Sequence, residues 1–116
     1  MEKDQLYLQN ILESIDKIAR YLQGVDQQSF QADSKTQDAV IRQLEIIGEA
    51  ARYLSDELKA SSPQLPWRSI SGMRNHLVHR YFKVDLLEVW RTTQSDLAPL
   101  FTAVKILLET LQKGNS

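Results

Sequence analysis

Three long stretches of the chain, at about residues 4–23, 34–59 and 85–112, carry apolar residues at alternating steps of three and four. Because an α-helix turns once in about 3.6 residues, this spacing puts the apolar side chains of each stretch on one helix face. The stripe residues are Leu8, Ile11, Ile15, Ile18 and Leu22; Val40, Leu44, Ile47, Ala51, Leu54 and Leu58; and Leu86, Trp90, Leu97, Leu100, Val104, Leu107 and Leu111. The pattern predicts an all-α fold, an up-and-down bundle of roughly four to five helices with short connections.

Start and stop signals flank these stretches. Gly24 is expected to end the first helix, and Ser34 to cap the second. Asp85 opens the sequence DLLE, whose cap-x-x-Glu form is typical of a helix start. Pro99 lacks an N–H, and its ring crowds the preceding turn. The stripe keeps its register across Pro99, so we expect a kink there and not a helix end.

Shorter helical segments are expected between the long ones. Residues 27–33 can hold one extra turn around Phe30. Pro66 suits the first position of a helix, and residues 67–82 are predicted to form a shorter, less regular helical segment.

Length and composition narrow the class of protein. The 116 residues predict one domain spanning residues 1–116. The chain has no cysteine, which excludes thiolate catalysis, thiolate zinc sites and disulfides. No apolar run approaches the ~18 residues of a membrane span, and the first residues do not resemble a signal peptide. We therefore expect a cytoplasmic protein that does not bind membranes.

Positive charge is concentrated in one part of the chain. Residues 58–84 contain five basic residues and no acidic one, although the net charge of the whole chain is −1. The overall charge argues against a general nucleic-acid coat, whereas the local excess favours one small anion-binding site. Both histidines lie inside this region, in the sequence GMRNHLVHRYF of residues 72–82.

Several readings of this cluster are open from the residues alone. On an ideal helix Arg74 projects among apolar residues, where a guanidinium needs a partner or solvent. His79 projects to the opposite side, so the segment bends or a second subunit supplies the missing group. His76 and His79 could be surface residues, and Tyr81 could lie at the edge of the core. A metal held by the two histidines is disfavoured, because no carboxylate or cysteine lies nearby in sequence.

Residues 66–100 resemble the HEPN-domain toxins of the HepT type. The signature of that family is Arg, four residues, His, one residue, Tyr, and it matches Arg74, His79 and Tyr81. Asn75 and the pair Val84–Asp85 match too, and QLEIIGEAARYLSDEL in the second helix does so more loosely. One departure is Arg80, where relatives often carry a small or acidic residue.

The resemblance implies a homodimeric, metal-independent ribonuclease that needs no cofactor and is the toxin of a toxin–antitoxin module. The helices would form a HEPN-like bundle that dimerises through the motif-bearing region. The cognate antitoxin would be a minimal nucleotidyltransferase that transfers AMP to Tyr81. By the same resemblance Arg74 and His79 are catalytic and Asn75 is supporting. His76, Arg80 and Lys83 are assigned to RNA binding.

The chemistry of these residues suits such a reaction. Attack of the RNA 2′-hydroxyl on the adjacent phosphorus needs a base, an acid and positive charge. Histidine and arginine supply these groups near neutral pH. One chain has a single signature histidine for two proton transfers, and a dimer would provide the second. The alternative is a non-catalytic helical module that binds a nucleotide or a protein, which a damaged signature would have favoured.

Overall fold

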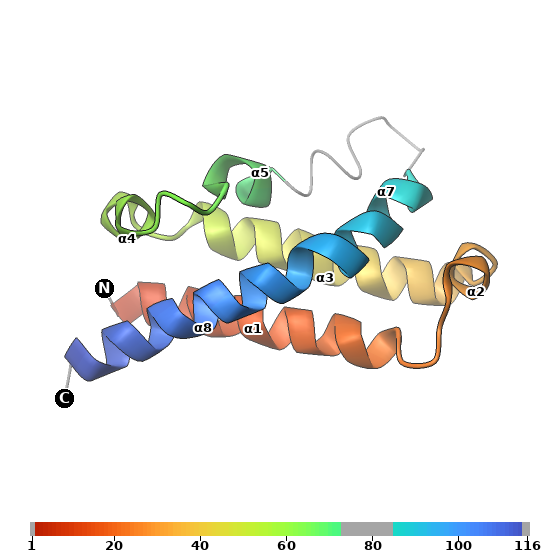
Figure 1. Ribbon diagram of the computed structural model, residues 1–116, viewed down its shortest axis with the longest axis horizontal. Coiled ribbons are helices and arrows are strands. Elements are labelled where there is room, and N and C mark those ends of the chain that lie inside the picture. Colours follow the sequence, from red (N-terminus) through yellow and green to blue (C-terminus); the bar gives the residue numbers. More distant parts are fainter. Residues whose placement is uncertain (1, 73–84, 115–116) are drawn as a thin grey trace.

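The computed structural model describes residues 2–72 and 85–114, and every regular element within them is helical (Figure 1). Three helices are long: α1 (Glu2–Tyr21), α3 (Ser34–Arg52) and α8 (Leu97–Gly114). The shorter elements are α2 (Gln27–Gln31), α4 (Asp56–Ser61), α5 (Trp67–Ser71), α7 (Leu86–Arg91) and the π-helical turn η1 (Thr92–Asp96). The predicted all-α bundle is confirmed. No helix in the described residues is both long and apolar enough to cross a membrane.

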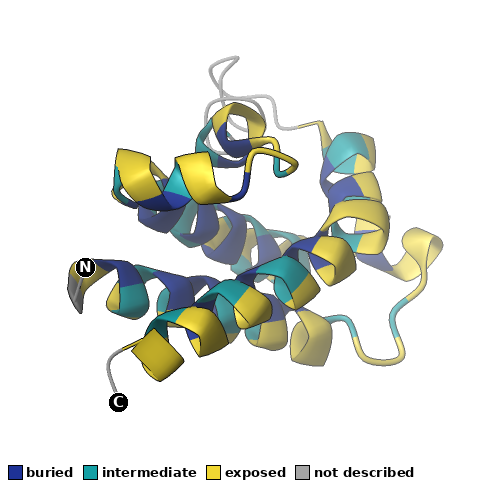
Figure 2. Ribbon diagram, turned by 60° about the vertical axis from the view of Figure 1, so that its left-hand side comes forward, coloured by how far each residue is buried: buried dark blue, intermediate teal, exposed yellow. Residues whose placement is uncertain are grey.

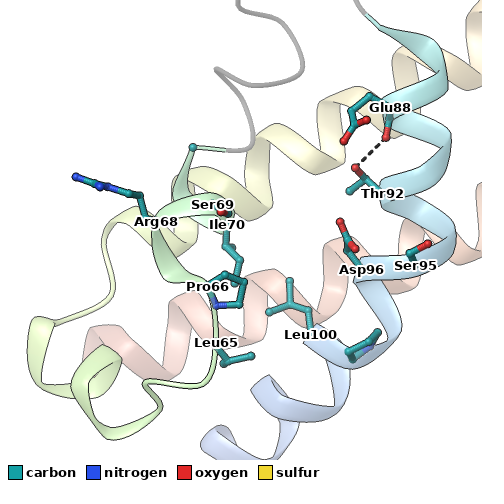
Figure 3. A pocket seen from close by; sticks show the side chains of 12 residues that line it. Leu65, Pro66, Arg68, Ser69, Ile70, Glu88, Thr92, Ser95, Asp96 and Leu100 are labelled. Carbon is teal, nitrogen blue, oxygen red and sulfur yellow. Dashed lines mark hydrogen bonds between the residues drawn. The ribbon is translucent and has the colours of Figure 1, made fainter.

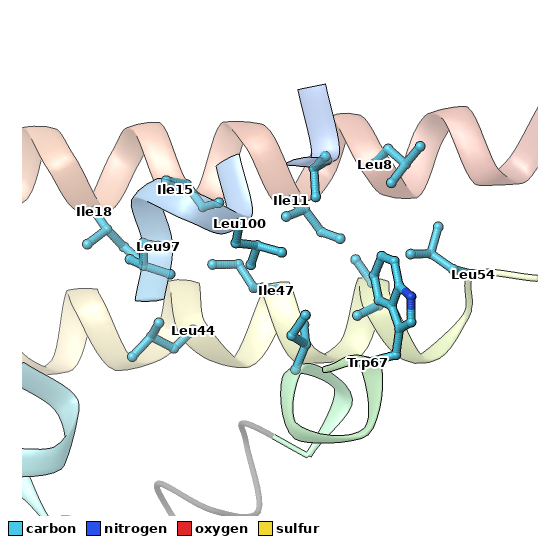
Figure 4. Close-up of a cluster of buried hydrophobic side chains, with 14 of the residues drawn as sticks. Leu8, Ile11, Ile15, Ile18, Leu44, Ile47, Leu54, Trp67, Leu97 and Leu100 are labelled. Carbon is cyan, nitrogen blue, oxygen red and sulfur yellow. The ribbon is translucent and has the colours of Figure 1, made fainter. Parts of the chain in front are cut away.

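The core lies where α8 meets the pair α1 and α3. Leu97 and Leu100 of α8 insert between Ile15 of α1 and Leu44 and Ile47 of α3 (Figure 4). Buried positions face the centre of the bundle, and exposed positions cover its outside (Figure 2). Full burial of one such aliphatic side chain is worth ~1.5–3 kcal/mol, so the three stripes account for the association of the long helices.

The extra turn expected around Phe30 is present as α2. Phe30 is fully buried, and its ring lies 5.4 Å from the ring of Trp90 on α7, measured between centroids. Asp26 caps α2 by accepting a hydrogen bond from the Ser29 N–H. This aromatic contact fixes the start of the last helical segment against the corner between α1 and α3.

The expected continuous helix over residues 34–59 is wrong, because α3 ends at Arg52 and α4 begins at Asp56. Ser55 caps α4 through its Oγ, which accepts from the Leu58 N–H at 3.1 Å. The carboxylate of Asp4 on α1 in turn accepts from the Ser55 N–H at 2.8 Å and from its Oγ at 2.7 Å. A buried partner thus replaces the carbonyl that the Ser55 N–H would bond in a continuous helix.

The other signals locate the helix ends to within a few residues. Gly24 has φ +76°, the left-handed conformation that glycine adopts without strain, just beyond α1. Asp85 caps α7 by accepting from the Glu88 N–H at 3.1 Å, as predicted. The expected cap Ser34 is instead the first residue of α3, because Asp33 accepts from the Thr36 N–H at 3.2 Å.

Two of the three prolines, Pro66 and Pro99, flank elements that border the site. The helical chain continues through Pro99, as expected, and its irregularity takes the form of η1 just before that proline. Pro66 is the cap residue of α5, one position before the first helical residue. The indole N–H of Trp67 donates to the carbonyls of Lys59 and Ser62, which fixes α5 to the end of α4.

Candidate functional site

The residues assigned to the site from the sequence all fall in segment 73–84, outside the described residues. They are Arg74, Asn75, His76, His79, Arg80, Tyr81 and Lys83. Their assignments therefore stay predictions. The described residues define the two helices that this segment joins, α5 before it and α7 after it.

A cavity of about 590 Å³ lies between these two helices (Figure 3). Gly72, which ends the described chain before the segment, lines it and precedes Arg74 by two positions. The cavity extends from α5 on one side to α7, η1 and the start of α8 on the other. In sequence, the predicted catalytic segment thus joins the two helices that border this cavity.

The base of the cavity is apolar and well packed. Ile70 of α5 and Leu100 of α8 are nearly fully buried, while Leu65 is half-buried beside them. Pro66 and Pro99 are exposed and stand on opposite sides. This part of the cavity therefore presents apolar surface to a ligand.

The wall formed by α7 and η1 is rich in hydrogen-bond acceptors. Glu88, Thr92, Ser95 and Asp96 line it. The buried Thr92 hydroxyl donates to the Glu88 carbonyl at 2.9 Å, and its oxygen can still accept a hydrogen bond. Asp96 is exposed and directed toward the cavity (Figure 3). This wall suits a ligand that donates hydrogen bonds or carries positive charge.

The π-helical turn explains why so many polar groups reach one wall. Thr92, Ser95 and Asp96 all belong to η1. A π turn is rare, costs regular hydrogen bonds, and is often found at functional sites. The Pro99 ring would crowd the Ser95 carbonyl in a regular helix, and the wider turn relieves this crowding.

The opposite wall carries a basic residue that does not enter the cavity. Arg68 of α5 is exposed, and its guanidinium points away from the other labelled side chains (Figure 3). Neither this guanidinium nor the Asp96 carboxylate has a hydrogen bond or ion pair within the described part of the chain. Among the described residues, the two walls of the cavity thus carry groups of opposite charge, Arg68 on one and Asp96 on the other.

The acceptor wall is not among the sites predicted from the sequence. A signal for it exists, because the third apolar stripe steps seven residues from Trp90 to Leu97 and the intervening RTTQSD is entirely polar. Such a gap in an otherwise regular stripe marks a part of the helix that contributes no apolar residue to the core.

Within residues 2–72 and 85–114, no three His, Asp or Glu side chains cluster closely enough to hold a metal ion.

Comparisons with known proteins find relatives described as ribonucleases. The family model described as "Ribonuclease HepT-like" matches residues 11–107 of the chain. The "Probable ribonuclease HepT" of Thermococcus cleftensis is 42% identical over 94 residues, which cover 81% of this chain and 86% of that protein. The "Putative RNase MJ1380" of Methanocaldococcus jannaschii is 35% identical over 101 residues, which cover 87% of this chain and 93% of its own length.

A bacterial relative covers nearly the whole length of both chains. The "Putative RNase TTE0752" of Caldanaerobacter subterraneus is 33% identical over 109 residues, 94% of this chain and 97% of that protein. No solved structure matches the chain significantly.

Proposed function

Because the chain belongs to the HepT-like ribonuclease family, we propose that it is a metal-independent endoribonuclease and the toxin of a toxin–antitoxin module. The observation that carries the proposal is the intact signature of Arg74, His79 and Tyr81 inside the matched residues 11–107. The signature lies in the segment that joins α5 to α7.

The proposed reaction uses the RNA itself as nucleophile. One His79 takes the proton of the 2′-hydroxyl, and the oxygen attacks the adjacent phosphorus. The bond to the 5′-oxygen breaks, and a second His79 returns a proton to that leaving oxygen. Arg74 stabilises the charge that grows on the non-bridging oxygens, because its planar fork matches a phosphate. The products are a 2′,3′-cyclic phosphate and a free 5′-hydroxyl.

A homodimer supplies the two histidines that this reaction needs. Two chains related by a two-fold axis contribute two Arg74 and two His79 to one composite site. Asn75 supports the site, and His76, Arg80 and Lys83 bind RNA phosphates around it. Sedimentation at micromolar concentration should give the mass of two 13.4-kDa chains. A strict monomer that still cleaves RNA would contradict the composite site.

The direct test is incubation of the purified protein with total RNA in EDTA. We expect cleavage products that end in a 2′,3′-cyclic phosphate, and no cleavage by the His79→Ala variant prepared in the same way. His76→Ala is the matched control, because it removes a histidine outside the signature and should lower the rate only mildly. Cleavage by His79→Ala at the parental rate would overturn the catalytic assignment.

The antitoxin proposed for this toxin is a minimal nucleotidyltransferase that transfers AMP from ATP to the Tyr81 hydroxyl, with pyrophosphate as the leaving group. Each AMP adds one phosphodiester charge, which competes with RNA phosphate for Arg74, Arg80 and Lys83. Intact-mass spectrometry of the co-expressed pair should show whole AMP increments on the parental toxin and none on Tyr81→Phe. An unmodified Tyr81 in a fully neutralised complex would show that the antitoxin acts by binding alone.

A further inference from the structure

We propose that Trp67 is a positioning residue for RNA cleavage, because its indole N–H holds α5 against the end of α4. The chain passes from α5 directly into the segment that carries the signature. The inference rests on the proposed function for the reaction that is positioned. It adds a residue outside the signature, and it is carried by hydrogen bonds and packing that the described residues make.

The helix α5 is too short to hold its own place. It has only five residues, Trp67–Ser71, and isolated helices shorter than ~12–15 residues are marginal in water. Among the described residues, no side chain caps its start. Its place therefore depends on its attachment to other elements, through the two residues that it buries, Trp67 and Ile70.

The Trp67 indole supplies the polar part of this attachment. Its Nε1 donates to the Lys59 carbonyl at 3.1 Å and to the Ser62 carbonyl at 3.0 Å. Lys59 lies in the last turn of α4, and Ser62 is the cap residue of that helix. The Trp67 ring rises from α5 toward Leu54 in the core (Figure 4). One donor thus ties the first residue of α5 to the end of α4.

Both acceptors of the indole also have a backbone donor. The Lys59 carbonyl accepts from the Ser62 N–H at 3.2 Å, and the Ser62 carbonyl accepts from the Leu65 N–H at 3.2 Å. Neither carbonyl would lose its last partner if the indole N–H were removed, so the fold should tolerate that loss. What the indole adds is a fixed position of α5 relative to α4.

The helix at the other end of the segment has its own anchor. Trp90 of α7 is the only other tryptophan of the chain, and its ring lies 5.4 Å from the ring of the fully buried Phe30. Because this contact does not involve α5, a shift of α5 would leave α7 in place. The separation of the two helices that the segment joins would then change.

The start of the segment lies close to this tether along the chain. Gly72 is the cap residue of α5, and its N–H donates to the Arg68 carbonyl at 2.9 Å. Arg74 follows two positions later, and two residues span at most ~7 Å of chain. A displaced α5 therefore displaces the point from which the chain reaches Arg74. An error of about 1 Å in placing a catalytic group can cost ~10²-fold in rate.

The first test is Trp67→Phe, which removes the N–H and keeps an aromatic ring. We expect kcat to fall about 10–100-fold, KM to change less, and circular dichroism to show a folded protein. Steady-state kinetics on an RNA oligonucleotide that the parental protein cleaves measure both constants. Ser61→Ala is the matched control, because the Ser61 hydroxyl donates to the Leu58 carbonyl within α4 and does not bond α5. It should keep the parental kcat.

Amide hydrogen exchange reads the tether without an activity assay. The Ile70 N–H donates to the Pro66 carbonyl, and the Gly72 N–H to the Arg68 carbonyl, both at 2.9 Å. In Trp67→Phe these two amides should exchange roughly 10-fold faster, whereas those of α1 keep their rates. Unchanged exchange at both positions would overturn the tether.

A second pair of variants loosens α5 through its other buried residue. Ile70→Val removes one methylene from α5, and Ile18→Val removes the same group from α1; both residues are nearly fully buried. If the place of α5 sets the rate, Ile70→Val lowers kcat and Ile18→Val does not. This pair decides the question even if Trp67→Phe fails to fold, and equal kcat values for the two would overturn the inference.

The outcomes separate this inference from the proposed function. Parental protein that cleaves RNA, with an unchanged kcat in Trp67→Phe, would overturn the inference and leave the proposed function intact. An equal loss of kcat in Ser61→Ala would also overturn it, since that change leaves the indole in place. A parental protein that does not cleave RNA would overturn the proposed function, and the positioning role of Trp67 with it.

Discussion

The contact between α1 and α3 and the cavity between α5 and η1 lie in one small molecule but use different side chains. The first is closed by aliphatic residues such as Ile11 and Ile47, which are fully buried. The second is walled by hydroxyls and carboxylates, with a π turn and an outward-facing Arg68. The contact between α1 and α3 is made by regular α-helices, whereas one wall of the cavity is formed by the irregular turn η1.

The difference shows which side chains stabilise the fold and which do not. Each residue that an aliphatic stripe buries lowers the free energy of the folded state relative to the unfolded state. The residues of η1 gain little from the core, since Ser95 and Asp96 are exposed. Within residues 2–72 and 85–114, no ion pair links Arg68 or Asp96 to the rest of the bundle. Groups that do not stabilise the fold are candidates for function.

Loss of His79 should produce the largest effect, and it should be on activity alone. His79→Ala should lower the cleavage rate about 10²–10⁴-fold, the usual contribution of general acid–base catalysis. Its unfolding midpoint in urea should match that of the parental protein at equal concentration. A large fall in stability without a fall in the rate per folded molecule would place His79 with the core and contradict the division between the two regions.

Truncation of Ile47 should produce the opposite result. Ile47 is fully buried on α3 between α1 and α8. Ile47→Ala should lower the unfolding free energy by about 2–5 kcal/mol, through lost burial and a cavity. Ile106→Ala is the matched control, because Ile106 is 59% exposed and its loss should cost less than about 0.5 kcal/mol. Folded Ile47→Ala protein should still cleave RNA, and urea titration with an activity assay measures both.

The sequence predicts the apolar contacts between the long helices better than it predicts the polar cavity wall. The stripes located α1 and α8, and Asp85 was recognised as a cap, because these signals lie within a few residues of one another. The break at Ser55 was missed, because its partner Asp4 lies 51 positions away in the chain. The choice of Asp33 over Ser34 was missed too, since either side chain can cap a helix and only geometry decides.

The acceptor wall is a further case that spacing alone does not reveal. Glu88 and Asp96 are eight positions apart, and they share a wall because α7 and η1 run on without a break. No sequence rule places Arg68 of α5 across from them. By contrast, the catalytic roles of Arg74 and His79 are inferred from a family signature, and they stay predictions that kinetic measurements must test.

The link between Asp4 and Ser55 should have an intermediate effect on stability. Asp4 is 2% exposed and accepts two hydrogen bonds from Ser55. Asp4→Ala leaves the Ser55 N–H without its acceptor, which should cost about 1–3 kcal/mol. Asp16→Ala, an exposed change on the same helix, is the matched control. Equal midpoints for the two variants in urea would show that the link does not hold α4 against α1.

The smallest effect is expected at the corner between α2 and α3, where two exposed caps respond to acid. Hydrogen bonds from the Thr36 hydroxyl and N–H lower the pKa of Asp33 below its ordinary value of 3.8. Those from the Ser29 N–H and hydroxyl lower the pKa of Asp26 in the same way. A carboxyl whose pKa falls on folding stabilises the native state above its unfolded pKa. That contribution is lost as the pH falls through the folded pKa, below about 3.8.

Asp33→Asn isolates this contribution, because the amide oxygen still accepts from the Thr36 N–H but cannot ionise. The variant should therefore lose less stability than the parental protein when the pH is lowered from about 6 to about 3. All other carboxyls titrate alike in the two proteins, so the difference between their urea midpoints reports Asp33 alone. Parallel loss in both proteins would show that the cap is equally strong with and without its charge. The acid sensitivity of the bundle would then arise from other carboxyl groups.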